Sequence, residues 1–164
     1  MLLYTETQID KLFVSNREEA VRKLSELQVY SGKTPTFTGL GGWVYEQTLH
    51  YCVKREMQRL KIKAVISEQV TLHSRVKADL TVGKVAVEIK SRGLFDSISA
   101  AKYGAYAKAA KEKGYKYLFV TRQENYKPYK TAIRREIGRQ NAFFLDIDGE
   151  WKRFIERVVE LTAP

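Results

Sequence analysis

The chain has 164 residues, 44% hydrophobic and 29% charged, a balance typical of one globular domain with its own core. No apolar run approaches the roughly 20 residues of a membrane span, and polar residues follow residues 1–4 at once, which excludes a signal-peptide core. We therefore expect a cytoplasmic protein without a membrane partner. The formal net charge of +10 favours a polyanionic partner such as nucleic acid, although a basic structural protein would carry the same charge.

The N-terminal third of the chain is predicted to be helical, with one loop. Residues 5–29 form one bent helix or two, because Thr5 with Gln8 and Ser15 with Glu18 both fit capping boxes. Residues 31–39 are rich in glycine, proline and hydroxyl side chains and form a loop, in which Lys33 is expected to contact a phosphate backbone. The next helix covers residues 40–60. It carries Glu46 beside its apolar stripe, either facing the sheet edge or as a solvated charge.

Three strands are predicted next, at residues 64–72, 75–82 and 85–91. Apolar and polar residues alternate on both sides of Gly83 and Lys84, which indicates a hairpin with a two-residue turn. That turn fixes a register in which one face is apolar, and the facing pairs are Val82–Val85, Leu80–Val87 and Ala78–Ile89. On the other face Asp79 stands opposite Glu88, with Lys90 as the diagonal neighbour of Asp79. Opposed like charges repel unless a cation lies between them.

The remainder alternates between helix and strand. Helices are expected at residues 97–113, 129–137 after Pro128, and 151–161, with strands at 117–121 and 142–147. A hairpin followed by helix-linked strands predicts an α/β fold, with a mixed central sheet flanked by helices on both faces. All of residues 1–164 are assigned to one domain. The lone Cys52 lies on a helical apolar stripe and is expected to be a buried small hydrophobic residue.

Two facing carboxylates suit Mg²⁺ or Mn²⁺, hard cations that prefer oxygen ligands. Such an ion polarises a phosphoryl oxygen and acidifies a bound water, and Lys90 could orient that water. The hairpin therefore predicts metal-assisted phosphodiester hydrolysis. The alternative is a solvated hairpin face on which Asp79 and Lys90 form a weak salt bridge.

The residues Asp79-x8-Glu88-Ile89-Lys90, preceded by Gly42-x3-Glu46, resemble the motif of the PD-(D/E)XK nuclease superfamily. The resemblance covers about residues 39–122 and implies a restriction-endonuclease-like αβββαβ core. It implies that Asp79, Glu88 and the Ile89 backbone carbonyl bind the metal. It further implies that Lys90 orients the attacking water, and that Glu46 is an additional ligand.

Within this superfamily the chain looks most like the archaeal-type Holliday junction resolvases, which implies cleavage of branched DNA. Three features depart from the patterns of these families. Ala78 replaces the proline of the motif name, residues 1–30 have no counterpart in a minimal resolvase, and helix 97–113 lacks a Gln-x-x-x-Tyr pattern.

The expected function is a Mg²⁺-dependent DNA endonuclease, working as a homodimer if it cuts both strands. The alternative is a non-catalytic nucleic-acid-binding module that retains the fold. Positive side chains would bind phosphates without reading sequence. Those expected to contact DNA are Lys33, Lys102, Lys127, Lys130, Arg134, Arg135 and Arg139.

Overall fold

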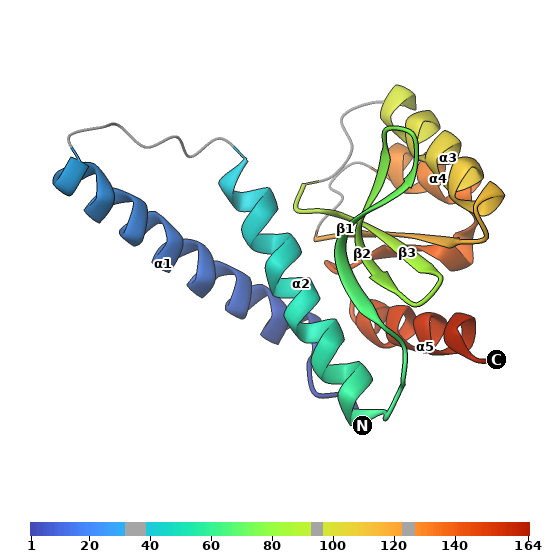
Figure 1. Ribbon diagram of the computed structural model, residues 1–164, viewed down its shortest axis with the longest axis horizontal. Helices are drawn as coiled ribbons and strands as arrows, with labels where there is room; N and C mark the ends of the chain where they lie inside the picture. Colours follow the sequence, from blue (N-terminus) through green and yellow to red (C-terminus); the bar gives the residue numbers. More distant parts are fainter. Residues whose placement is uncertain (32–38, 93–96, 123–126) are drawn as a thin grey trace.

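The computed structural model of the chain describes residues 1–31, 39–92, 97–122 and 127–164. Five helices and five strands follow one another in these parts (Figure 1). They are α1 Glu6–Ser31, α2 Leu40–Arg59, β1 Ile66–His73, β2 Val76–Val82, β3 Val85–Lys90, α3 Ser97–Glu112, β4 Lys116–Thr121, α4 Lys127–Ile137, β5 Ala142–Phe144 and α5 Glu150–Thr162. The predicted α/β class is confirmed.

The five strands form one mixed sheet in the order β1-β2-β3-β4-β5. The first three strands pair antiparallel, and β3, β4 and β5 pair parallel. Gly83 has a φ of 57°, as the tight turn between β2 and β3 requires. The predicted pairs Val82–Val85 and Leu80–Val87 are confirmed. The last strand is shorter than expected and ends at Phe144, three residues before Ile147.

Helices cover both faces of the sheet. Figure 1 shows α3 and α4 together on one side, with α1, α2 and α5 on the other. Val82, Val85 and Val87 point toward α2 and α5 and belong to the larger apolar cluster. Ala86 and Phe119 belong to a second cluster, under α3 and α4. Because both faces are covered, the central strand β3 is buried over Val85–Ile89, which rules out a freely solvated hairpin face.

The N-terminal helix is one continuous element that packs on the body of the protein. The Thr5 N–H donates to Gln8 Oε1 at 2.9 Å, and the Gln8 N–H donates to Thr5 Oγ1 at 3.2 Å, so the predicted capping box is confirmed. Of the two predicted alternatives, one helix or two, the single helix is confirmed, because α1 runs through Ser15. Arg122, after β4, donates to Asp10 Oδ1 at 2.5 Å and ties α1 to the sheet.

The hairpin is kinked at Gln69 and Asp79, which the alternation does not predict. Gln69 has a φ of 48°, and the β1–β2 pairing skips it between Glu68–Leu80 and Val70–Ala78. On the C-terminal side of Gln69, Val70 packs under α3, whereas Ile66 on its N-terminal side packs under α2.

The same change of face occurs in β2 and overturns one predicted pair. Leu80 packs in the cluster under α2, but Ala78 packs in the cluster under α3. Ile89 remains in the α2 cluster, so Ala78 and Ile89 do not share one apolar face, and that prediction is wrong. The ladder between β2 and β3 runs from Val82–Val85 to Leu80–Val87.

Two simpler expectations concern burial and membrane helices. Cys52 is fully buried in the larger cluster, as predicted, and burial raises the pKa of its thiol to about 12. Within the described part of the chain, no helix combines the length and apolar character that crossing a membrane needs.

Candidate active site

The ion pair between Glu88 and Lys90 lies near the carboxyl end of β3. Both side chains project from β3 toward α3, because residues two apart share one face of a strand. Lys90 Nζ lies 2.8 Å from Glu88 Oε1 and 5.4 Å from the centre of the Tyr103 ring on α3. Glu88 is only 5% exposed. A carboxylate this buried needs a cationic partner, and Lys90 provides one.

Asp79 reaches the same region from β2. Its Oδ2 accepts the Ile89 N–H at 2.7 Å, in the place where a regular antiparallel ladder would continue. The side chain thus replaces a backbone acceptor and closes the end of the β2–β3 pairing. The N–H and the C=O of one strand residue point to the same side, so the Ile89 carbonyl faces this edge as well.

Glu46 joins this group from α2 through Gln69. Gln69 Nε2 donates to Glu46 Oε2 at 3.1 Å and to Asp79 Oδ1 at 3.3 Å. One amide group therefore bridges two acids from two different elements. The left-handed backbone at Gln69 turns its side chain into this position. The next residue of α2, Gln47, donates to Glu68 Oε2 at 3.1 Å, and His50 Nδ1, one turn further along, contacts the same carboxylate.

The acids of this cluster hold their protons more tightly than usual. Burial, followed by the nearby Asp79 charge, raises the pKa of Glu46 to about 7 and that of Glu88 to about 7. Burial also raises the pKa of Asp79, against the Ile89 hydrogen bond and the Lys90 charge. Burial lowers the pKa of Lys90, but Glu88 and Tyr103 outweigh it and leave that pKa above its usual value. Lys90 is therefore a stable cation, but its single positive charge does not offset the three nearby acids, whose pKa values stay raised.

Oxygen donors of this kind match what Mg²⁺ and Mn²⁺ prefer, and such ions need only one or two protein carboxylates because they keep several waters. Asp79 and Glu88 are the two carboxylates that could serve in this way. Among the described residues, no group of three or more His, Cys, Asp or Glu side chains forms a metal-ligand cluster. The donor chemistry thus fits two direct carboxylate ligands rather than a complete set of protein ligands. Glu46 is occupied by its hydrogen bond from Gln69.

Aromatic rings and a second lysine form the α3 wall of the site. Tyr103 is 6% exposed and packs edge to face against Tyr106, with ring centres 5.8 Å apart. Lys102 Nζ lies 5.6 Å from the Tyr103 ring and 5.4 Å from the Tyr106 ring. Lys102 is exposed, so its charge faces both the solvent and the site.

The predicted DNA contacts divide into exposed and internally bound side chains. Lys33 lies outside the described residues, and Lys127 opens α4. Lys130 Nζ pairs with Asp146 Oδ2 at 3.2 Å, and the Arg134 guanidinium lies 4.7 Å from the centre of the Phe144 ring. Both side chains therefore serve packing at the β5 edge.

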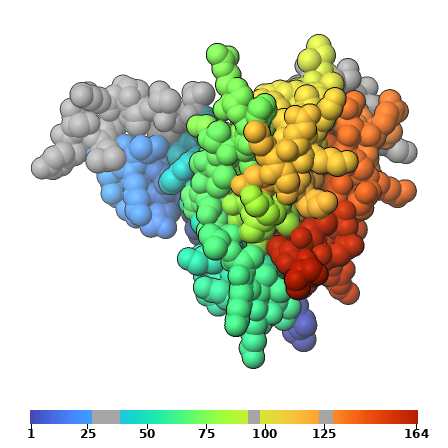
Figure 2. Space-filling view, turned by 45° about the vertical axis from the view of Figure 1, so that its right-hand side comes forward, coloured from blue at the N-terminus to red at the C-terminus, as the bar shows by residue number. Residues whose placement is uncertain are grey.

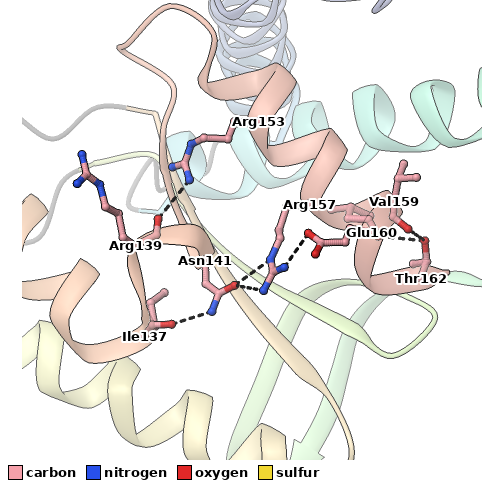
Figure 3. Close-up of polar contacts among 9 residues, drawn as sticks. Ile137, Arg139, Asn141, Arg153, Arg157, Val159, Glu160 and Thr162 are labelled. Atoms are coloured by element: carbon pink, nitrogen blue, oxygen red, sulfur yellow. Dashed lines mark hydrogen bonds and ion pairs between the residues drawn. The ribbon is translucent and has the colours of Figure 1, made fainter. Parts of the chain in front are cut away.

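Arg135 and Arg139 are exposed. Figure 3 shows the Arg139 side chain pointing away from the neighbouring network, while its backbone carbonyl accepts from Arg153 NH1 at 3.2 Å. In that network Asn141 Oδ1 accepts from Arg157 at 3.1 and 3.2 Å. Among the predicted contacts whose side chains the structure describes, Lys102, Arg135 and Arg139 carry a charge that is available at the surface.

No family model matches the chain, and neither the curated proteins nor the solved structures include a significant match to it. The site must therefore be interpreted from its own chemistry.

Sequence reasoning missed Gln69 and the position of Tyr103 beside Lys90. Residues 67–69 are three consecutive polar residues, and this break in the alternation is the available signal for a kink in β1. Tyr103 offers no such signal, because a tyrosine on an alanine-rich helix fits a packing role equally well.

Proposed function

We propose that the protein is a Mg²⁺-dependent DNA endonuclease of the PD-(D/E)XK type. The observation that carries this proposal is the meeting of Asp79, Glu88 and Lys90 at the end of the β2–β3 pairing, with Glu46 linked to them by Gln69. The element order α2-β1-β2-β3-α3-β4 agrees with the restriction-endonuclease-like core that the motif implies. The excess of basic residues supports a polyanionic substrate.

Each residue of the site would have a separate role in the reaction. Asp79 and Glu88, with the Ile89 carbonyl, would hold the divalent cation, which supplies Lewis-acid polarisation of the phosphate and acidifies a water. Lys90 donates a hydrogen bond to the attacking water and stabilises negative charge as the phosphorus is attacked. Glu46 holds a second water once its bond to Gln69 opens.

Several fixed contacts would keep these groups in place. The Ile89 N–H orients Asp79, and Tyr103 packs beside Lys90, so neither charge has to be repositioned during the reaction. The motif further suggests a branched or otherwise structured DNA substrate, and cutting both strands would require a homodimer.

A cleavage assay tests the proposal. Single-stranded, duplex, flapped and four-way-junction DNA are incubated with Mg²⁺, with Mn²⁺ or with EDTA, using the wild type, Asp79→Asn and Lys90→Ala. Cleavage is expected only with metal, and it should be strongly reduced in both Asp79→Asn and Lys90→Ala. Lys84→Ala is the matched control, because it removes the same charge about 20 Å away along β3 and should leave cleavage intact.

The absence of metal-dependent cleavage on every substrate, or cleavage by both variants at the wild-type rate, would contradict the proposal. DNA binding that persists without cleavage would favour the non-catalytic binding module, in which the Glu88–Lys90 pair only stabilises the fold.

A further inference from the structure

We propose that an unpaired nucleobase stacks on Trp43 at the edge of the site, so that the preferred substrate offers single-stranded nucleotides beside the cleaved phosphate. This inference rests on the proposed function for the identity of the ligand, and it adds the class of substrate. The observation behind it is an indole side chain that lies mostly in solvent instead of in the core.

Trp43 is the most exposed aromatic side chain among those described. It is 58% exposed, whereas the only other tryptophan, Trp151, is 1% exposed and packs in the larger core cluster. Tryptophan is usually well buried, because its large apolar surface is costly to leave in water. An indole left in solvent is therefore available to a partner.

The position of Trp43 links it to the site. It lies one helical turn before Glu46 and Gln47, and residues three and four apart are neighbours on a helix surface. Glu46 contacts Gln69, and Gln47 contacts Glu68, both on the edge strand β1. A side-chain carbon on the preceding residue, Gly42, would lie 3.9 Å from Ser91 Oγ, an ordinary contact distance to the residue that directly follows Lys90.

The surroundings of Trp43 favour a nucleobase over an apolar protein surface. Further along the same face of α2 its neighbours are Gln47 and His50, and the apolar neighbour one turn before it, Leu40, packs against the core, so the indole does not continue into an exposed apolar patch along α2. Arg92 is exposed and directly follows Ser91, the residue next to Gly42, so its positive charge is available to a phosphate beside the base. Figure 2 shows the green β1–β2 segment at the surface between α2 and the yellow α3.

The chemistry of stacking then defines the substrate. An aromatic ring binds the face of any base, which makes the contact tolerant of sequence. Inside a duplex both faces of each base are covered by neighbouring bases, so Trp43 can stack only on a base that is unpaired or at an open end. Single strands, flaps and the arms of opened junctions meet this condition.

Tryptophan fluorescence provides the test. Because Trp151 is buried, a ligand that stacks in solvent should quench mainly the fluorescence of Trp43. The protein in EDTA, which prevents cleavage, is titrated with a single-stranded oligonucleotide, with the same sequence as a duplex whose two ends are closed by linkers, and with the same strand carrying abasic sites. We expect strong quenching of the indole fluorescence by the intact single strand and little quenching by the duplex. The abasic strand should quench less than the intact single strand. Trp43→Ala should weaken single-strand binding by about 5- to 150-fold, the range for the loss of one stacked base, while duplex binding stays within about 2-fold.

Two further variants separate stacking from damage to the fold. Trp43→Phe keeps an aromatic face and should retain most of the single-strand affinity. Tyr51→Ala removes the 49% exposed ring about two turns along the same helix and should change nothing. Equal quenching by duplex and single strand, or unchanged binding by Trp43→Ala, would overturn the inference. So would an indole that iodide cannot quench in the free protein.

This binding test is independent of cleavage. If the stacking inference alone is wrong, metal-dependent cleavage is still observed without quenching of Trp43. If the proposed nuclease function alone is wrong, Trp43 is still quenched by single strands although no DNA is cleaved.

Discussion

Glu46 is the residue at which the electrostatics of the site are most easily measured. It is partly buried near Asp79, Glu88 and Glu68, and its pKa is raised to about 7 from an ordinary value near 4.5. A raised pKa means that the folded state holds the proton more tightly than the unfolded chain. The stabilisation is therefore fully present below about pH 4.5 and is lost as the pH rises to about 7.

Glu46→Gln is expected to remove this loss. The glutamine carbonyl can still accept the Gln69 hydrogen bond, but it carries no charge at any pH. Without metal, at pH 8, the variant should be more stable than the wild type by about 1 kcal/mol, less than the full pKa shift would give because the side chain is partly solvated. At pH 4 the two proteins should be equally stable. Urea unfolding in EDTA at both pH values measures the difference, and a constant difference would contradict the assigned repulsion.

Asp79, Glu88 and Lys90 could be predicted from the sequence because they alternate with apolar residues around an identifiable turn. The turn sets which residues face one another, and this local rule holds up to Leu80 and Val87. Beyond that pair the structure departs from the rule. The Asp79 carboxylate takes the Ile89 N–H, and no alternation pattern reports such a side-chain-to-backbone bond.

The kink in β1 is the main feature at the scale of the elements. Gln69 adopts a left-handed backbone, which costs a residue with a side chain about 1–2 kcal/mol. The gain is that β1 packs under α2 before Gln69 and under α3 after it, while the Gln69 amide bridges Glu46 and Asp79.

Paired substitutions at Gln69 separate the backbone from the side chain. Gln69→Ala loses the amide and keeps the strained backbone, whereas Gln69→Gly loses the amide and relieves the strain. We expect the glycine variant to be more stable than the alanine variant by about 1 kcal/mol in urea unfolding, although glycine ordinarily weakens a strand. Greater stability of the alanine variant would mean that position 69 does not hold a left-handed conformation in solution.

Most helices and strands could be predicted because their apolar spacing matches the period of each element. The capping box at Thr5 gave the correct helix start, but the similar pattern at Ser15 lies within α1, where packing against α2 and the Asp10–Arg122 pair favour one straight helix. The apolar run after Ala142 forms only a short edge strand. The Glu150 carboxylate accepts the Phe144 N–H at 3.0 Å, and the chain turns toward α5.

At the scale of the whole molecule, the net charge of +10 should govern binding to DNA. Each lysine or arginine that neutralises a phosphate releases counterions, so affinity falls as salt rises. The structure distinguishes available charges from those already paired. Lys102 is exposed beside the site, whereas the Lys130 side chain is only 19% exposed and pairs with Asp146.

Lys102→Ala and Lys130→Ala therefore form a matched pair. In a plot of log affinity against log salt for duplex DNA, Lys102→Ala should make the slope shallower by about 0.9, the loss of one phosphate contact. Lys130→Ala should leave the slope nearly unchanged, because its charge is compensated within the fold. Fluorescence anisotropy over a series of salt concentrations measures both slopes. Equal changes would show that the Lys130–Asp146 pair opens on binding.

The distribution of charge over the molecule could be predicted only in part. The composition indicates a polyanionic partner, but it cannot tell that Arg134 packs on Phe144 or that Lys130 is paired, since both contacts depend on how α4 folds onto β5. The position of α2 relative to the hairpin, which brings Glu46 to Gln69, likewise depends on tertiary packing.

The catalytic role of Lys90 is the centre of the account, and a single comparison tests it most directly. The rate of Mg²⁺-dependent cleavage and the DNA affinity without metal are measured for the wild type and Lys90→Ala, with Lys84→Ala as the control. Loss of one group that stabilises developing charge should lower the cleavage rate by about 100-fold or more, while DNA affinity changes by less than about 3-fold. Cleavage by Lys90→Ala at the wild-type rate would contradict the proposed site.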